Sequence, residues 1–171
     1  MKQKPVMVEA YVGLGSNLGD REQNLARAMD LLAQRVKTVT TSSLYVTEPV
    51  DYGDQPLFLN AVCCVRTSLA PDELLGLAKR IEAAMGRKPS FVNGPRPIDI
   101  DILFYGDKVV NIPHLVIPHP RVQERAFVLV PLAEIAPRLV HPVSGRTVAE
   151  MVSRLKDRKG VRVWSQEAWN V

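Results

Sequence analysis

Residues 9–47 read EAYVGLGSNLGDREQNLARAMDLLAQRVKTVTTSSLYVT and contain one complete strand–helix–strand pattern. Residues 9–14 favour a short strand that ends in a glycine-rich turn. From Asp20 onward, apolar residues recur every three or four positions, which is the period of an amphipathic helix. Residues 37–47 are rich in β-branched side chains and predict a second strand. The apolar stripe of the helix consists of Leu25, Ala28, Met29, Leu32 and Val36.

The same pattern recurs farther along the chain. Residues 58–66 predict a strand, and a helix is expected to begin near Pro71 and to end at Gly86. Residues 98–104, IDIDILF, alternate strictly between apolar and other side chains and predict another strand. Two such units in this order are typical of an α+β fold, the ferredoxin-like βαββαβ sandwich.

Additional helices and a strand are expected after this core. Gly106 and Asp107 resemble a hairpin turn that leads into residues 109–112. Helices are expected over residues 124–135, where Pro131 interrupts the pattern, and over residues 147–156.

Length and composition indicate one globular domain over residues 1–171. Apolar residues make up 46% and charged residues 23%, which excludes a disordered chain. No apolar run has the roughly 18 residues of a membrane span, and no signal peptide is expected. The two cysteines, Cys63 and Cys64, are adjacent and cannot staple a secreted scaffold, so a cytoplasmic location is expected.

The net charge of +4 is too small by itself to indicate nucleic acid, but the charge is unevenly placed. Residues 79–96 hold five bases and one acid, and residues 154–162 hold the same numbers. The second cluster is interpreted as a solvated face or tail. The first leads directly into Asp99 and Asp101, and cations beside carboxylates suit a polyanion that is bound together with a divalent metal.

Asp99 and Asp101 share one face of their expected strand, because side chains alternate along a strand. Two neighbouring carboxylates repel each other unless a cation lies between them. The pair is therefore interpreted either as a Mg²⁺ site for phosphoryl chemistry or as the solvated face of a half-buried edge strand.

Other residues also leave two interpretations open. Glu82 either belongs to a phosphate site or forms a surface pair with Lys79. His119 is either a phosphate-facing group or an ordinary loop histidine. Phe58 and Asn60 either bind a flat heterocycle or serve the structure only. The stretch GLGSNLG lacks the residues of a dinucleotide fingerprint or P-loop and is interpreted as a turn.

Six blocks, in this order and spacing, resemble the 6-hydroxymethyl-7,8-dihydropterin pyrophosphokinase family of folate biosynthesis. They are GSNLGDR, SSLYVTEPV, DQPLFLNAV, RIEAAMGR, GPRPIDIDIL and VIPHPRVQERAFVLVPL. The resemblance covers residues 9–142, which leaves residues 143–171 as a C-terminal extension. It implies a ferredoxin-like diphosphotransferase that moves pyrophosphate from ATP to the pterin hydroxymethyl group and releases AMP.

The resemblance also implies a set of site residues. Catalytic roles fall on Arg87, Arg96, Asp99 and Asp101, and the two aspartates are the implied ligands of two Mg²⁺ ions. The implied ATP-binding residues are Leu75, Lys79, Glu82, Arg87, Arg96, Ile102, His119 and Arg125. The implied pterin-binding residues are Thr47, Pro49, Val50, Phe58, Asn60, Asp99 and Phe127. The expected partners are ATP and the pterin, with no nucleic acid, no membrane and a monomeric chain.

Two competing functions are an RNA-binding module and a catalytically inactive regulatory domain. The first would carry the ribonucleoprotein pattern [K/R]-G-[F/Y]-[G/A]-F, which this sequence lacks. The second would not need the carboxylate pair together with Arg96, His119 and Arg125.

Overall fold

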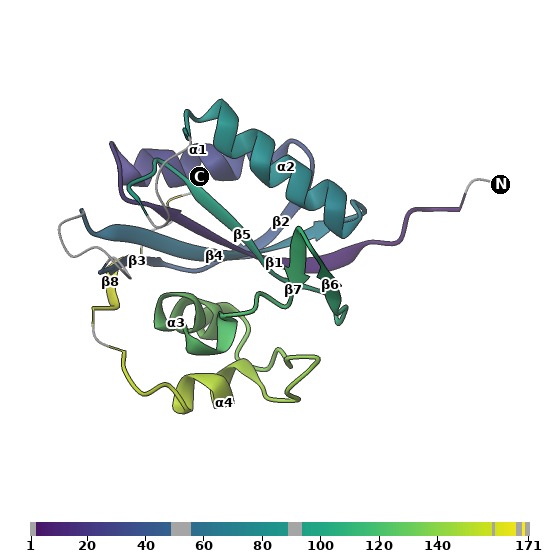
Figure 1. Cartoon of the computed structure of the whole chain (residues 1–171). Coiled ribbons are helices and arrows are strands. Elements are labelled where there is room, and N and C mark those ends of the chain that lie inside the picture. Colours follow the sequence, from purple (N-terminus) through teal and green to yellow (C-terminus); the bar gives the residue numbers. More distant parts are fainter. Residues whose placement is uncertain (1–2, 49–55, 89–93, 159, 167–168, 170–171) are drawn as a thin grey trace.

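The computed structural model describes residues 3–48, 56–88, 94–158, 160–166 and 169. Its centre is an antiparallel sheet with the strand order β5-β1-β4-β3-β8, in which β2 also pairs with β4 (Figure 1). The sheet strands are β1 (Val8–Ser16), β2 (Lys37–Thr41), β3 (Leu44–Thr47), β4 (Phe58–Thr67), β5 (Asp99–Tyr105) and β8 (Arg162–Ser165). The order of β5, β1, β4 and β3 confirms the predicted ferredoxin-like sandwich.

Helices cover both faces of the sheet (Figure 1). One face carries α1 (Arg21–Ala33) and α2 (Pro71–Ala84), and the other carries α3 (Ala126–Ile135) and α4 (Val148–Ser153). Residues 3–7, which precede β1, project away from this body (Figure 1). No helix in the described ranges is both long and apolar enough to cross a membrane.

The helix α1 begins and packs as its sequence predicts. The Asp20 side chain accepts a hydrogen bond from the Gln23 backbone N–H at 3.1 Å, which caps the helix. The predicted stripe is buried against the sheet, and Leu25 and Leu32 have at most 1% of their surface exposed. This face therefore holds the larger hydrophobic core, formed by α1, α2 and alternate residues of β1, β4 and β5.

The opposite face has a smaller core beneath α3. Val62, Leu103 and Phe104 of the sheet pack there with Leu129 and Leu132 of α3. A second attachment lies near the C-terminal end of this helix. The Glu134 carboxylate accepts hydrogen bonds from the Ser43 backbone N–H at 2.9 Å and from the Tyr45 hydroxyl at 2.8 Å. These bonds fix α3 relative to β3.

Residues 37–47 form two strands rather than the single predicted strand. Ser42 lies between them and exchanges hydrogen bonds with Val62 of β4: its N–H donates to the Val62 carbonyl at 2.8 Å, and its hydroxyl accepts from the Val62 N–H at 2.9 Å. Because of this side-chain bond, the ladder is interrupted at Ser42. Both strands nevertheless pair with β4, so the topology is unchanged.

The prediction of a hairpin at Gly106 is wrong. The strand β6 (Val110–Ile112) pairs with β7 (Leu115–Ile117) in a separate two-stranded sheet and does not pair with β5. Gly106 has a positive φ of 52°, and its N–H donates to the Glu9 carbonyl of β1 at 2.8 Å. The turn is thus fastened to β1, which directs the chain away from the edge of β5.

The C-terminal elements extend the sandwich on two sides. The helix predicted over 124–135 corresponds to α3, which follows a 3-10 turn at Val122–Glu124. The expected interruption at Pro131 is wrong, because Pro131 lies inside α3. The helix α4 is capped by Thr147 and is shorter than predicted. The strand β8 pairs with β3, and the Trp169 indole N–H donates to the Ser42 carbonyl at 2.9 Å.

Candidate active site

A row of three residues crosses the sheet beside the start of α3. In the strand register, Gly15 of β1 is paired with Asn60 of β4 on one side and with Asp99 of β5 on the other. Laterally paired residues point to the same face of a sheet, so the amide and the carboxylate lie on either side of a glycine. The same face carries Asp101 and Phe58, because each is two residues from a member of this row.

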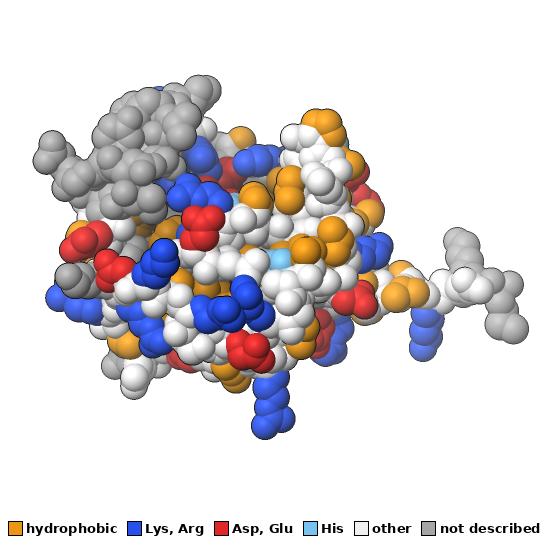
Figure 2. Space-filling model, turned by 60° about the horizontal axis from the view of Figure 1, so that its bottom comes forward, with side chains coloured by type: hydrophobic (Ala, Val, Ile, Leu, Met, Phe, Trp, Pro, Cys, Tyr) orange, Lys and Arg blue, Asp and Glu red, His pale blue; other side chains and the backbone are white. Residues whose placement is uncertain are grey.

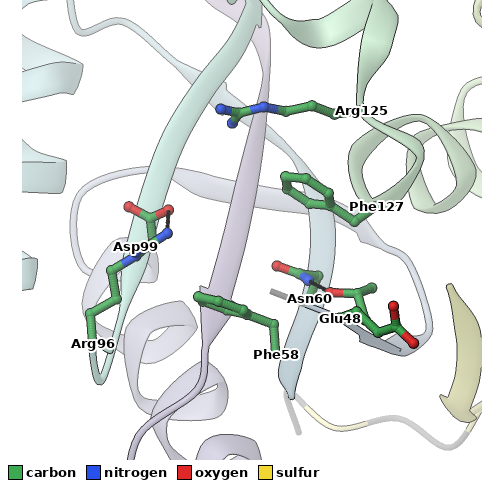
Figure 3. A pocket seen from close by; sticks show the side chains of 8 residues that line it. Glu48, Phe58, Asn60, Arg96, Asp99, Arg125 and Phe127 are labelled. Atoms are coloured by element: carbon green, nitrogen blue, oxygen red, sulfur yellow. Dashed lines mark hydrogen bonds and ion pairs between the residues drawn. The ribbon is translucent and has the colours of Figure 1, made fainter. Parts of the chain in front are cut away.

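A hollow of about 450 Å³ opens over this row (Figure 3). Its lining comes from β3, β4, β5, the loop before β5 and the start of α3. The lining residues are Thr47, Glu48, Phe58, Asn60, Arg96, Asp99, Arg125 and Phe127. An adjoining hollow of about 280 Å³ shares Asn60, Asp99 and Phe127 and is bordered by Asp101.

Two aromatic rings and an amide form one half of the larger hollow. The rings of Phe58 and Phe127 come from opposite walls, β4 and α3, and Asn60 lies beside the space between them (Figure 3). The Asn60 side-chain N–H donates to the Thr47 hydroxyl at 2.5 Å, and both residues are buried. Flat apolar faces with a fixed amide at their edge suit a planar heterocycle that also forms hydrogen bonds.

Two arginines form the other half. The Arg96 guanidinium lies 5.0 Å from the centre of the Phe58 ring, and the Arg125 guanidinium lies 5.4 Å from that of Phe127. Among the described residues, the buried Nε atom of each arginine has no hydrogen-bond partner. A buried N–H without a partner is costly, so two of them in one hollow indicate an acceptor-rich anion such as a phosphate.

The carboxylate of Glu82 supports the site from α2. It has 3% of its surface exposed and accepts hydrogen bonds from the Ile100 backbone N–H at 3.0 Å and from Arg87. Arg87 also donates to Asp99 at 2.8 Å, so Glu82 and Asp99 hold this guanidinium between them. The predicted pair with Lys79 is present at 3.3 Å, but the Glu82 carboxylate is buried and does not lie on the surface.

Asp101 is a buried carboxylate beside a second carboxylate. Burial and the neighbouring charge of Asp99 raise its pKa from 3.8 to about 7, although Arg125 acts in the opposite direction. A divalent cation would relieve this penalty, and carboxylate oxygens are ligands that Mg²⁺ prefers. Within the described ranges no group of three or more acidic, histidine or cysteine side chains could hold a metal. The pair fits Mg²⁺ when phosphate oxygens complete the coordination.

His119 is neutral near pH 7. Burial, followed by the charge of Arg125, lowers its pKa to about 4. Its Nδ1 atom accepts a hydrogen bond from the Arg121 backbone N–H at 3.2 Å. The ring proton is therefore on Nε2, which can donate a hydrogen bond to an anion.

Several predicted site residues lie outside the larger hollow. Leu75 packs against the main core, and Ile102 is buried within it. Lys79 forms an ion pair with Glu82, and Arg87 bonds to Glu82 and Asp99. Of these four predicted residues only Asp99 lines the hollow, and His119 does not line it either. Pro49 and Val50 are outside the described residues.

Sequence reasoning missed two residues of the site. Glu48 lines the hollow, and its position next to the predicted Thr47 could have indicated this. Gly15 separates Asn60 from Asp99, but one sequence contains no signal for that register.

Comparisons with known proteins find similar sequences and structures. A sequence model of the family described as 7,8-dihydro-6-hydroxymethylpterin-pyrophosphokinase matches residues 11–137. A protein of Methylorubrum extorquens named 2-amino-4-hydroxy-6-hydroxymethyldihydropteridine pyrophosphokinase is 48% identical over 157 residues, covering 91% of this chain and 98% of that protein. A Bacillus subtilis protein with the same name is 44% identical over 161 residues, covering 93% and 92%.

Longer proteins also contain a matching segment. The folic acid synthesis protein fol1 of Pneumocystis carinii is 47% identical over 148 residues, which are 86% of this chain but 20% of that protein. This chain thus spans about a fifth of that relative's length. The crystal structure of Plasmodium falciparum wild-type HPPK-DHPS with pteroate has a TM-score of 0.71 at 19% identity, covering 90% of this chain and 43% of that one. It shows the same fold.

Proposed function

The chain belongs to the 7,8-dihydro-6-hydroxymethylpterin-pyrophosphokinase family, and we propose that it transfers pyrophosphate from ATP to 6-hydroxymethyl-7,8-dihydropterin in folate biosynthesis. The products are the pterin diphosphate and AMP. One observation carries this proposal: a slot for a flat heterocycle lies on the same sheet face as a carboxylate pair, with one glycine between them.

The pterin is proposed to bind between Phe58 and Phe127. The geometry that supports this is the pair of rings on opposite walls and the Asn60 amide, whose orientation the Thr47 hydroxyl fixes. Stacking holds the ring faces, and the amide oxygen accepts a hydrogen bond from the ring edge. Asp99 lines the same hollow, so its carboxylate can contact both the pterin and the metal. Pro49 and Val50 stay predictions from the resemblance.

ATP is the co-substrate, and we propose that its phosphates bind beside the carboxylates. Asp99 and Asp101 would hold two Mg²⁺ ions, which supply Lewis-acid polarisation and charge neutralisation of the phosphate oxygens. The Nε–H groups of Arg96 and Arg125 have no hydrogen-bond partner in the part of the chain that the structure describes, which supports a phosphate at this position. The remaining proposed ATP-binding residues are Leu75, Lys79, Glu82, Arg87, Ile102 and His119.

The chemistry then depends on positioning and electrostatics. In this proposal the pterin hydroxyl lies on the carboxylate side of Asn60. Its oxygen bonds to the β-phosphorus in line while the bond from that phosphorus to the AMP oxygen breaks, and the hydroxyl proton passes to solvent. Arg87, Arg96 and Arg125 offset the negative charge that develops on the departing AMP, and His119 donates from Nε2 to a phosphate oxygen. None of the lining side chains described above is assigned as a general base.

We further propose that residues 1–171 form one monomeric domain in the cytoplasm, with a core over residues 9–142 and an extension over 143–171. The extension is supported as part of the domain because β8 pairs with β3 and α4 packs on α3. On the face that carries α3 and α4, basic side chains are dispersed among acidic and apolar ones (Figure 2). This dispersed charge supports small-molecule substrates over nucleic acid.

The test is to incubate the chain with ATP, Mg²⁺ and the reduced pterin and to separate the nucleotides. AMP that forms only when the pterin is present supports the proposal. ADP as the product would contradict pyrophosphoryl transfer, and no turnover would favour the inactive regulatory domain.

A further inference from the structure

Gly15 lies between the two halves of the site. Its register partners are Asn60, in the proposed pterin slot, and Asp99, in the proposed metal site. Any side chain at this position would point to the face where the substrates meet. The absence of a side chain at Gly15 therefore keeps this part of the site open.

The requirement at Gly15 is for space and not for an unusual backbone. Gly19, Gly86, Gly106, Gly145 and Gly160 have positive φ angles, whereas Gly15 does not. A Cβ atom on Gly15 would lie 2.6 Å from the Oδ1 atom of Asn60, which is closer than real Cβ contacts. The next nearest atom is the Cδ1 of Phe58 at 3.6 Å, an ordinary contact. The clash is therefore with the amide oxygen alone.

The amide of Asn60 cannot simply move aside. It has 8% of its surface exposed, and its nitrogen is bonded to the Thr47 hydroxyl at 2.5 Å. Thr47 has 3% exposed and is part of the paired strand β3. Displacing Oδ1 by a few tenths of an ångström would rotate the amide or lengthen its hydrogen bond to Thr47, because close-packed interiors leave little free space.

We propose that Gly15 is a positioning residue: by carrying no side chain, it holds Asn60 Oδ1 as a hydrogen-bond acceptor at the edge of the slot. This selects a heterocycle with an N–H donor at that edge. The inference rests on the proposed function, because it assumes that the slot binds the pterin. Gly15 then determines pterin selectivity although it has no side chain with which to contact the pterin.

The expected effect of Gly15→Ala is specific to the pterin. The value of kcat/KM for the pterin falls at least about tenfold, which is about 1.4 kcal/mol, while the KM for ATP stays within about twofold. Gly13→Ala is the matched control: it adds the same methyl on the same face of β1, where the three nearest atoms all belong to the Leu103 side chain at 3.6–3.8 Å. Because Gly13 is paired with Asp101 and not with Asn60, this variant changes the KM for the pterin less than about twofold.

A double-mutant cycle with Asn60→Ala shows whether Gly15 acts through the amide. Without Oδ1 there is no clash, so adding Gly15→Ala to Asn60→Ala changes kcat/KM for the pterin less than about twofold. The rate is measured where it rises linearly with pterin concentration, so weak binding does not prevent the comparison. The cycle remains informative if Gly15→Ala alone does not fold, because the double variant relieves the contact.

A spectroscopic signal gives a second readout. The Asn60 side-chain amide signals in a ¹⁵N–¹H correlation spectrum shift in Gly15→Ala and stay in place in Gly13→Ala. Equal losses in the wild-type and Asn60→Ala backgrounds, or an unchanged kcat/KM in Gly15→Ala, would overturn the inference. A wild-type chain that forms no AMP would contradict the proposed function instead, so the two failures are distinguishable.

Discussion

The buried carboxylate of Asp101 leads us to predict that Asp101→Asn raises the stability of the metal-free chain and lowers its activity. Burial and Asp99 raise the pKa of Asp101 to about 7, so the folded chain holds this proton more tightly than the unfolded chain, whose aspartates titrate near 4. A raised pKa stabilises the fold at low pH, and this contribution is lost as pH rises from about 4 to about 7. Without Mg²⁺ the fold therefore carries an unfavourable charge at pH 8, which Asp101→Asn removes.

The magnitude follows from the same shift. A pKa that moves from about 4 to about 7 corresponds to about 4 kcal/mol at pH 8. Because Asp99 shares the repulsion and Arg125 opposes it, we expect Asp101→Asn to stabilise the metal-free chain by about 2–4 kcal/mol at pH 8. In a chain of this size that raises Tm by about 5–15 °C. Near pH 4 the gain vanishes, because Asp101 is then protonated.

The assay is thermal unfolding in EDTA at about pH 4.5 and pH 8, followed by circular dichroism, together with turnover in Mg²⁺. Asp101→Asn is expected to unfold at a higher temperature at pH 8 and to lose turnover. Asp99→Asn is the matched control on the same strand face. It loses the ion pairs with Arg87 at 2.8 Å and Arg96 at 3.5 Å and is expected to lower Tm. A Tm of Asp101→Asn below that of the wild type at pH 8 would refute the reasoning.

Three further substitutions test the supports of the site. Glu82→Ala leaves the buried Ile100 N–H without its acceptor and should lower the free energy of unfolding by about 2–4 kcal/mol in urea, whereas a loss below about 1 kcal/mol would contradict this role. Glu134→Ala removes the bonds between α3 and β3, including that to Tyr45, and should cost about 1–3 kcal/mol, measured by the same denaturation; no change would show that α3 is held by its core alone. Phe127→Leu should raise the KM for the pterin about tenfold and leave the KM for ATP within about twofold, and equal effects on both would argue against the slot.

The fold was predictable from sequence because it depends on periodic burial. The stripe of α1 and the alternation of residues 98–102 are each visible along the chain, and the structure buries their apolar side chains as expected. The alternation predicted through residue 104 is wrong, because a register shift between β1 and β5 places Leu103 and Phe104 in the same core. The division of residues 37–47 was not predictable, because it depends on Ser42 bonding to Val62, twenty residues away. The pairing of β6 was missed for a related reason: Gly106 is fastened to Glu9.

The site was predictable only in part. The alternation of Asp99 and Asp101 indicates a shared face without any structure. The burial of Glu82, by contrast, arises where α2 meets β5, and its acceptor role toward Ile100 involves two separate segments. The placement of Gly15 beside Asn60 depends on strand register, which one sequence does not contain. Contacts that join distant segments are thus the part that needed the structure.

The most direct test of the central claim is to follow the phosphorus atoms of ATP during turnover with the pterin and Mg²⁺ by ³¹P NMR. Transfer of pyrophosphate as a unit predicts a pair of coupled resonances from the pterin diphosphate, together with the single resonance of AMP. Appearance of ADP with a pterin monophosphate, or of free inorganic phosphate in their place, would contradict the account.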